Sequence, residues 1–159
     1  LFINAGVARF CAFAKCSEAL WDQTFDINVK GPYFQIQALL PLFNHGAAIV
    51  INGSINAHLG VPGSSVYAAS KAALISLART LSAELLPHGV RVNVISPGPV
   101  ATRMHGADEA HRKAIAAQVP LGRLGTADEI AATVLHLSAT KSAFIVGSEI
   151  IADGGMSRL

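Results

Sequence analysis

Four short apolar segments alternate with longer segments of helical period, and this alternation constrains the fold more than any other feature of the sequence. The short segments are rich in Ile and Val without polar alternation, which is typical of strands buried on both faces. Strands that alternate with helices predict right-handed crossovers and a parallel sheet covered on both sides. We therefore predict a three-layer α/β domain with strands at Leu1–Asn4, Ala48–Asn52, Val90–Ile95 and Ile145–Ile151.

Three segments repeat apolar residues at three-and-four spacing, which predicts helices that pack on this sheet. The first contains Gly31-Pro32, and a proline inside a helix removes a hydrogen bond and bends the axis. The third follows Thr126, with Glu129 at the position that completes a capping box. The predicted helices span Glu18–Phe43, Val66–Leu86 and Ala127–Leu137, and Pro87-His88-Gly89 ends the second.

Composition limits the class of protein. With 159 residues, of which 52% are apolar, the chain can bury one core, so we expect a single domain over residues 1–159. Charged residues make up 14%, the net charge is +2, and Lys and Arg are scattered, so a nucleic-acid surface is not expected. Every apolar run is interrupted well before the roughly 20 residues that a membrane-spanning helix needs, so no membrane span is expected.

The cysteines and histidines do not suggest a metal site or a secreted disulfide framework. Cys11 and Cys16 stand five apart, which predicts free thiols and a cytoplasmic protein. The six His residues lack the spacing of metal ligands, and we expect no metal. The long mixed segment Ser96–Leu124 fits a mobile loop that covers a substrate. Within it we predict a solvated helix over Met104–Leu124, with His105, Asp108, Glu109, His111 and Arg112 facing outward.

Tyr67 and Lys71 stand four residues apart at the start of a predicted helix, so both side chains leave the same face. An ammonium group about 4 Å from a phenol, at an effective dielectric near 20, would lower its pKa by up to roughly three units. By itself this spacing also fits an ordinary surface pair. Ser54 lies at the end of a predicted strand, thirteen residues before Tyr67, where ligands of open parallel sheets bind. The three residues together predict acid–base chemistry.

Further motifs follow one another in a fixed order, and the chain resembles the short-chain dehydrogenases/reductases, single-domain enzymes of Rossmann type, over nearly its whole length. Several independent motifs in one order are more specific than any of them alone. The matching motifs are Asn4-Ala5-Gly6, Asn28-Val29-Lys30-Gly31, Ser54, Tyr67 with Lys71, Pro97-Gly98-Pro99-Val100-Ala101-Thr102, Pro120 to Arg123, Asp128-Glu129-Ile130-Ala131 and Asp153-Gly154-Gly155.

The resemblance implies a catalytic set. It makes Tyr67 the general acid/base on a carbonyl or alcohol oxygen, and Ser54 a hydrogen-bond donor to that oxygen. It makes Lys71 the group that lowers the Tyr67 pKa and holds the nicotinamide ribose, and Asn28 the anchor of a water in a proton relay. Asn56 could contact the substrate, or it could serve only the turn.

The resemblance also implies NAD or NADP as cofactor, a small-molecule substrate, and a homodimer or homotetramer that pairs the helices beginning near Asn28 and at Tyr67. Cofactor contacts would come from three groups of residues: Asn4, Ala5 and Gly6; Tyr67 and Lys71; and Pro97, Gly98, Val100 and Thr102. The expected fold is a Rossmann-like αβα sheet that lacks the family's first strands.

The family's glycine-rich phosphate loop has no counterpart in these residues. In the family, the residue that selects NAD against NADP lies in the region that contains this loop, so the coenzyme preference of this chain is not predicted. If the 159 residues are the whole polypeptide, we expect weak or no cofactor binding, and association through the edge at Leu1–Asn4. A second hypothesis is a catalytically silent fragment or isoform that serves as an oligomerisation or interaction module.

Overall fold

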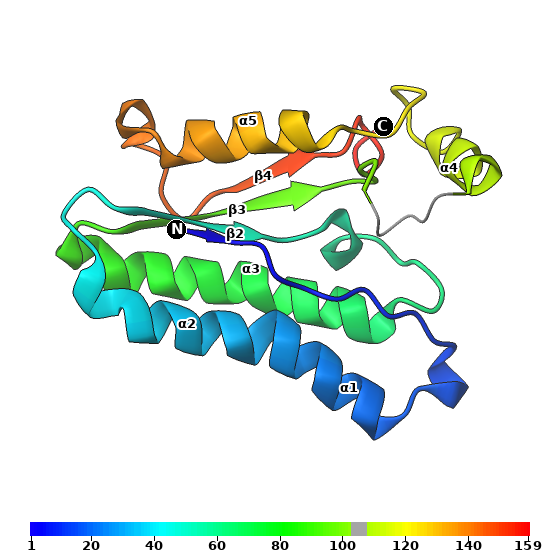
Figure 1. The fold of residues 1–159 in the computed structure, drawn as a ribbon, viewed down its shortest axis with the longest axis horizontal. Coiled ribbons are helices and arrows are strands. Elements are labelled where there is room, and N and C mark those ends of the chain that lie inside the picture. The colour runs from blue at the N-terminus through cyan, green and yellow to red at the C-terminus, as the bar shows by residue number, and fades with distance from the viewer. Residues whose placement is uncertain (103–107) are drawn as a thin grey trace.

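The computed structural model describes residues 1–102 and 108–159, and it contains one parallel sheet of four strands. The strands lie in the order β1-β2-β3-β4, which is also their order along the chain. Helices cover both faces, with α1, α2 and α3 on one side and α5 on the other (Figure 1). The predicted three-layer α/β architecture is confirmed. The strands are β1 (Phe2–Ile3), β2 (Ala48–Asn52), β3 (Arg91–Pro97) and β4 (Glu149–Ala152).

The two central strands divide the core into two layers. Along β2, Ile49 and Ile51 pack in the cluster that includes Leu74 of α3, while Val50 joins Leu137 of α5 on the opposite face. All three β2 side chains are fully buried, as expected for a strand with helices on both sides. Helix α3 (Ser65–Leu85) fills the first layer, and α5 (Ala127–Ser138) fills the second.

The fourth strand is shorter than predicted. Residues 145–148 precede the strand, and Gly147 has a φ of 64°, which extended backbone does not adopt. Backbone bonds still join this segment to β3, from Gly147 N–H to the Val92 carbonyl over 2.9 Å and from Val94 N–H to the Ser148 carbonyl over 2.8 Å. Asn93 donates to the Ile145 carbonyl over 2.9 Å and accepts from Ser148 N–H over 3.0 Å, and Arg91 donates to the same Ile145 carbonyl over 3.1 Å. These side-chain bonds satisfy the Ile145 carbonyl and the Ser148 N–H, which the backbone of β3 does not pair.

The long predicted helix Glu18–Phe43 is divided. Helix α1 (Glu18–Phe25) passes into a π-helical turn at Asp26–Lys30, and α2 (Gly31–Leu39) follows, with a 3-10 turn at Leu40–Leu42. Pro32 stands in the first turn of α2, where its missing N–H is tolerated. The hydrogen-bond pattern of the helix therefore changes from α to π directly before the predicted bend at Gly31-Pro32. The π turn contains the buried Asn28.

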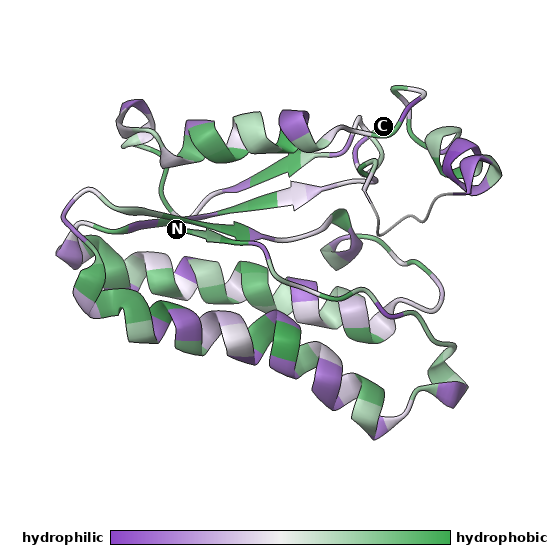
Figure 2. Ribbon diagram, viewed as in Figure 1, coloured by the Kyte–Doolittle hydropathy of each residue, from purple (hydrophilic) through white to green (hydrophobic). Residues whose placement is uncertain are grey.

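Two further predictions concern the C-terminal third. The capping box at the start of α5 is confirmed, since Thr126 accepts from Glu129 N–H and Glu129 accepts from Thr126 N–H. The helix predicted over Met104–Leu124 is shorter: α4 (Glu109–Ala116) begins after Asp108, and residues 103–107, with His105, lie outside the described residues. Figure 2 shows hydrophilic residues on α4, in agreement with a solvated helix. No helix in the described ranges is both long and apolar enough to cross a bilayer.

Candidate active site

The carboxyl ends of the strands open into a cavity of about 1100 Å³. Because the strands are parallel, the segments that leave them meet at one edge of the sheet. This volume lies at the top of the range for small-molecule sites, which run to roughly 1,000 Å³. Of the predicted site residues, Asn4, Ala5, Gly6, Ser54, Asn56, Tyr67, Lys71, Pro97, Gly98, Val100 and Thr102 all line it.

Tyr67 and Lys71 occupy the first turns of α3 and face this cavity. Tyr67 is 8% exposed and Lys71 is 4% exposed. The Lys71 ammonium donates to the Asn52 carbonyl at the end of β2 over 2.7 Å, and it lies 5.9 Å from the centre of the Tyr67 ring. The lysine is thus held between the helix and the sheet, beside the phenol.

Ser54 enters the site because β2 ends two residues earlier. Its backbone is extended, and it caps a 3-10 turn at Ile55–Ala57, where its Oγ accepts from Asn56 N–H over 3.2 Å. Its hydroxyl also makes a hydrogen bond to the Tyr67 side chain. The preceding Gly53 allows this approach, since a Cβ there would lie 2.5 Å from Ser96 Oγ.

Burial dominates the electrostatics of both titrating groups. It raises the pKa of Tyr67, and the hydrogen bond from Ser54 lowers it in part. Burial also lowers the pKa of Lys71 to about 8. The sequence predicted the opposite direction for Tyr67. The prediction failed because the Lys71 ammonium is turned toward the Asn52 carbonyl, so desolvation of the phenol outweighs the charge of the lysine.

Asn28 lies behind the cavity wall, fully buried. Its Oδ1 accepts from Val7 N–H over 2.8 Å, and its Nδ2 donates to the Val7 carbonyl over 2.9 Å and to Ser70 Oγ over 3.0 Å. The side chain therefore fixes the loop after β1 against α3. Its role as the anchor of a water relay stays a prediction.

The loop after β1 passes close to Asn28 and Lys71 because Gly6 has no side chain. A Cβ at this position would lie 3.2 Å from Asn28 Oδ1 and 3.6 Å from Lys71 Nζ. The neighbouring Asn4 accepts from Asn52 Nδ2 over 2.8 Å, which joins the ends of β1 and β2. The loop after β3 is equally close packed, since a Cβ at Gly98 would lie 2.7 Å from the Asp153 Cα.

Sequence reasoning missed the apolar part of the cavity. Phe10 packs on Tyr67 with ring centroids 5.8 Å apart and planes tilted by 54°. Apolar residues that also line the cavity are Leu59, Val61, Ile115 and Met156. They stand on loops and on α4 without a motif or a period, so the sequence gives no signal for them. The polar His111 and Gln118 line the cavity as well, so His111 differs from the prediction that it faces outward.

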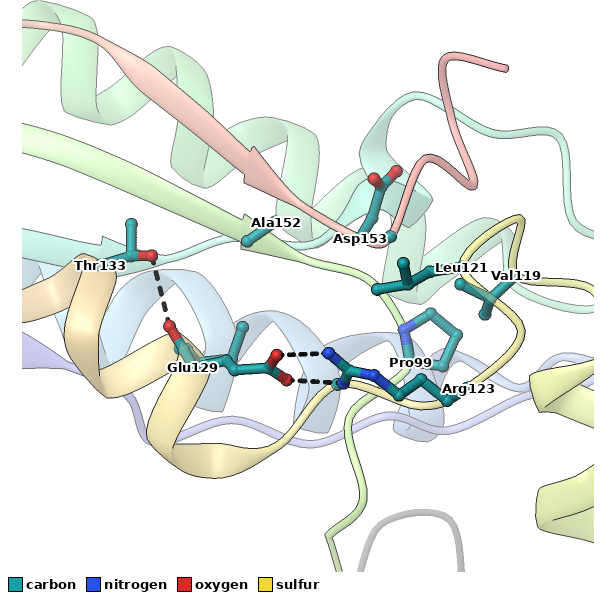
Figure 3. Close-up of a pocket in the computed structure, with 11 residues that line it drawn as sticks. Pro99, Val119, Leu121, Arg123, Glu129, Thr133, Ala152 and Asp153 are labelled. Carbon is teal, nitrogen blue, oxygen red and sulfur yellow. Dashed lines mark hydrogen bonds and ion pairs between the residues drawn. The ribbon is translucent and has the colours of Figure 1, made fainter.

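A smaller pocket of about 250 Å³ adjoins the loop after β3 (Figure 3). Arg123 reaches both carboxylate oxygens of Glu129 over 2.6 and 2.9 Å, and Figure 3 shows this pair beside Pro99 and Leu121. The hydrogen bond from Arg123, followed by that from Thr126, lowers the pKa of Glu129 to about 2. The pair joins the segment before α5 to the first turn of that helix.

A family comparison matches almost the whole chain. The family model described as Enoyl-(Acyl carrier protein) reductase matches residues 1–157. Dehydrogenase/reductase SDR family member 6 of Danio rerio is 35% identical over 98% of this chain and 67% of its own length. The chain belongs to the short-chain dehydrogenase/reductase family. This confirms the resemblance on which the site was predicted.

Other relatives agree on the family and differ in their activities. Oxidoreductase asL5 of Sarocladium schorii is 37% identical over 98% of this chain and 64% of its own length. The 3-oxoacyl-[acyl-carrier-protein] reductase FabG of Thermotoga maritima is 33% identical over 96% of this chain and 63% of its own length. The chain thus spans about two thirds of the relatives that it matches.

Solved structures of the family match the fold closely. A short-chain dehydrogenase family protein from Francisella tularensis superposes with a TM-score of 0.93 at 29% identity, over 99% of this chain and 70% of that one. A blue fluorescent protein from a metagenomic library, solved in complex with NADPH, gives a TM-score of 0.93 at 31% identity, over 98% of this chain and 64% of that one. The Rossmann-like αβα sheet is therefore confirmed.

Proposed function

We propose that this chain forms the catalytic part of an oxidoreductase that interconverts a secondary alcohol and a ketone with NAD or NADP. The observation that carries the proposal is the convergence of Ser54, Tyr67 and Lys71 on one cavity at the carboxyl end of the sheet. Relatives support the cofactor class, since one is an L-rhamnose 1-dehydrogenase (NAD(P)(+)) and a structural neighbour was solved with NADPH.

The residues of this cavity fit a nicotinamide cofactor. Gly6 leaves space beside Lys71, and the ammonium group has three donors, of which Asn52 accepts one in the described structure. Lys71 would bind the ribose hydroxyls with the remaining donors. The loops at residues 4–6 and 97–102 would bind the nicotinamide half from two sides. When bound, the cofactor supplies or accepts the hydride.

Tyr67 would exchange a proton with the substrate oxygen. During ketone reduction its phenol gives the proton to the developing alkoxide, and during alcohol oxidation its phenolate takes the proton back. Ser54 would donate a hydrogen bond to the same oxygen, where negative charge develops. Because burial raises the Tyr67 pKa, the phenol is protonated at neutral pH and ready to act as the acid in reduction.

The substrate would enter on the side lined by Phe10 and Asn56.

The protein would act as a homodimer or homotetramer. Exposed apolar side chains of α2 and of the turn after it support association, because covering an apolar surface is favourable. Tyr33 is 41% exposed, Phe34 53% and Leu42 72%.

Replacing Tyr67 by Phe tests the proposed function. Tyr67→Phe removes only the hydroxyl, so turnover should fall below a few per cent while the dissociation constants of NADH and NADPH, measured by isothermal titration, change little. Tyr33→Phe is the matched control, because it removes the hydroxyl of the other, more exposed tyrosine and should keep full turnover. Turnover of Tyr67→Phe above a few per cent would rule out the assigned role.

A further inference from the structure

A second polar cluster lies beside the turn that begins at Ser54. The Nε2 atom of His58 and the Oε1 atom of Glu149 are 2.7 Å apart, and Ser96 Oγ donates to the same Oε1 over 2.5 Å. An ionised carboxylate can only accept, so the imidazole is the donor. The Glu149 side chain is 12% exposed, and a carboxylate at such a depth is unfavourable without partners of this kind.

The cluster joins three elements that are separate in the chain. His58 directly follows the 3-10 turn Ile55–Ala57, whose first residue follows Ser54. Ser96 stands near the end of β3, and Glu149 begins β4. Because the sheet order is β1-β2-β3-β4, the strand that carries Glu149 is two positions away from the one that leads into Ser54. The hydrogen bond of the His58 imidazole therefore joins the turn after β2 to β4, a strand that does not pair with β2.

The remaining hydrogen bonds of the turn explain why this tie matters. At its start, the Gly53 N–H donates to a β3 carbonyl over 2.7 Å. Inside it, Ala57 N–H donates to the Ser54 carbonyl over 3.1 Å, and His58 N–H donates to the Ile55 carbonyl over 2.8 Å. The internal bonds give the turn its shape, and the buried Ile55 and the Ala57 side chain pack on the core. The hydrogen bonds that attach the turn to the sheet lie at its two ends. Gly53 holds the first end, and the His58 side chain holds the second.

We propose that His58 and Glu149 are positioning residues that hold the Ser54 hydroxyl against the Tyr67 phenol. The proposal rests on the proposed function, in which Ser54 must meet the substrate oxygen. Neither His58 nor Glu149 is among the residues that line the main cavity in the described ranges, so their effect passes through the turn. A displacement of a reacting group by about 1 Å can lower a rate by roughly 100-fold, so a small movement of the turn is enough.

A double-mutant cycle in the active protein tests whether the pair acts through Ser54. Glu149→Ala should lower kcat about tenfold, with the cofactor dissociation constant within about twofold, because only the alignment of the hydroxyl is lost. The double variant Ser54→Ala/Glu149→Ala should be no slower than Ser54→Ala alone, since the hydroxyl to be positioned is already absent. Effects that multiply in the double variant would overturn the proposal.

A titration of Tyr67 gives a second readout that needs neither substrate nor turnover. The Tyr33→Phe background leaves Tyr67 as the sole tyrosine of these 159 residues, and the difference in ultraviolet phenolate absorbance between this background and its Tyr67→Phe variant reports the Tyr67 pKa. Because the hydrogen bond from Ser54 lowers this pKa, both Ser54→Ala and Glu149→Ala should raise it, and the double variant should raise it no further. An unchanged titration in Glu149→Ala would overturn the positioning role, whatever the substrate is.

Conservative variants and distant controls separate positioning from folding. Glu149→Gln keeps an oxygen acceptor and His58→Gln keeps an N–H donor, so each should retain more than about half of kcat. The exposed Glu84 and His88 provide matched controls, and Glu84→Ala and His88→Ala should change neither kcat nor the Tyr67 titration. Circular dichroism confirms that each variant is folded before it is compared. A loss in the Gln variants equal to that in Glu149→Ala would contradict a tie made by hydrogen bonds.

Discussion

Lys71 connects the chemistry of the cavity to the stability of the fold. Its ammonium group is buried, and burial lowers its pKa from 10.5 to about 8. In the unfolded chain the same lysine is solvated, so between about pH 8 and 10.5 the unfolded state binds more protons than the folded state. The free energy of unfolding therefore rises with pH across this window, and below about pH 8 the full cost of the buried charge is present.

Replacing this lysine by an uncharged side chain of similar length should stabilise the protein and inactivate it. Lys71→Met removes a cost of about 3 kcal/mol at pH 7 and gives up a hydrogen bond worth about 1 to 2 kcal/mol, for a net gain of about 1 to 2 kcal/mol. The gain should shrink as the pH rises toward 10.5. Urea unfolding at pH 7 and pH 10 measures both values, and a gain independent of pH would show that the buried charge is not its source.

At the level of elements, the site depends on how closely the ends of β2 and β3 approach each other. Gly53 follows β2, and an added Cβ would lie 2.5 Å from Ser96 Oγ and 2.9 Å from Val94 Cγ1. Both contacts are too short for real atoms, and both neighbours are buried side chains of β3, which have little room to move. Ser54 is the next residue, so the packing of the two strands sets its position.

This packing predicts a large effect for a single methyl group. Gly53→Ala should lower the free energy of unfolding by about 2 to 3 kcal/mol and reduce turnover, because the strands must separate where Ser54 leaves the sheet. Gly60→Ala serves as the control, since a Cβ added at Gly60 would meet no described atom within 4 Å, and it should change stability by less than about 0.5 kcal/mol. Thermal melts of both variants make the comparison, and equal melting temperatures would contradict the packing argument.

At the scale of the whole molecule, the described surface leaves apolar side chains of α2 uncovered. If this helix pairs with a second copy, a charge in its exposed face should separate the subunits. Phe34→Glu should shift sedimentation toward the monomer, because Phe34 is 53% exposed on this face. Phe13→Glu is the control, since Phe13 is 89% exposed in the 3-10 turn Phe13–Lys15 before α1. A monomeric wild type, or dissociation by both variants alike, would reject this interface.

The sequence predicted most of the fold and of the polar site, for physical reasons that can be named. Buried strands and helix caps have local signals, which is why β2 and the Thr126 cap lie where they were predicted. The direction of the Tyr67 pKa was wrong because it depends on burial, a property of the folded chain that residue spacing does not contain. The contacts of Phe10 with Tyr67 and of His58 with Glu149 were not recognised, because tertiary packing brings these loop residues to their partners without any periodic pattern.

The lowered pKa of Lys71 has one more consequence, for reagents that form covalent bonds. An amine reacts with electrophiles only when it has lost its proton, and near pH 8 about half of the Lys71 side chains have done so. The amine also lines a cavity of about 1100 Å³, large enough to admit a small aldehyde or an activated ester. The burial that lowers the Lys71 pKa thus favours reaction of this amine with electrophiles that enter the cavity.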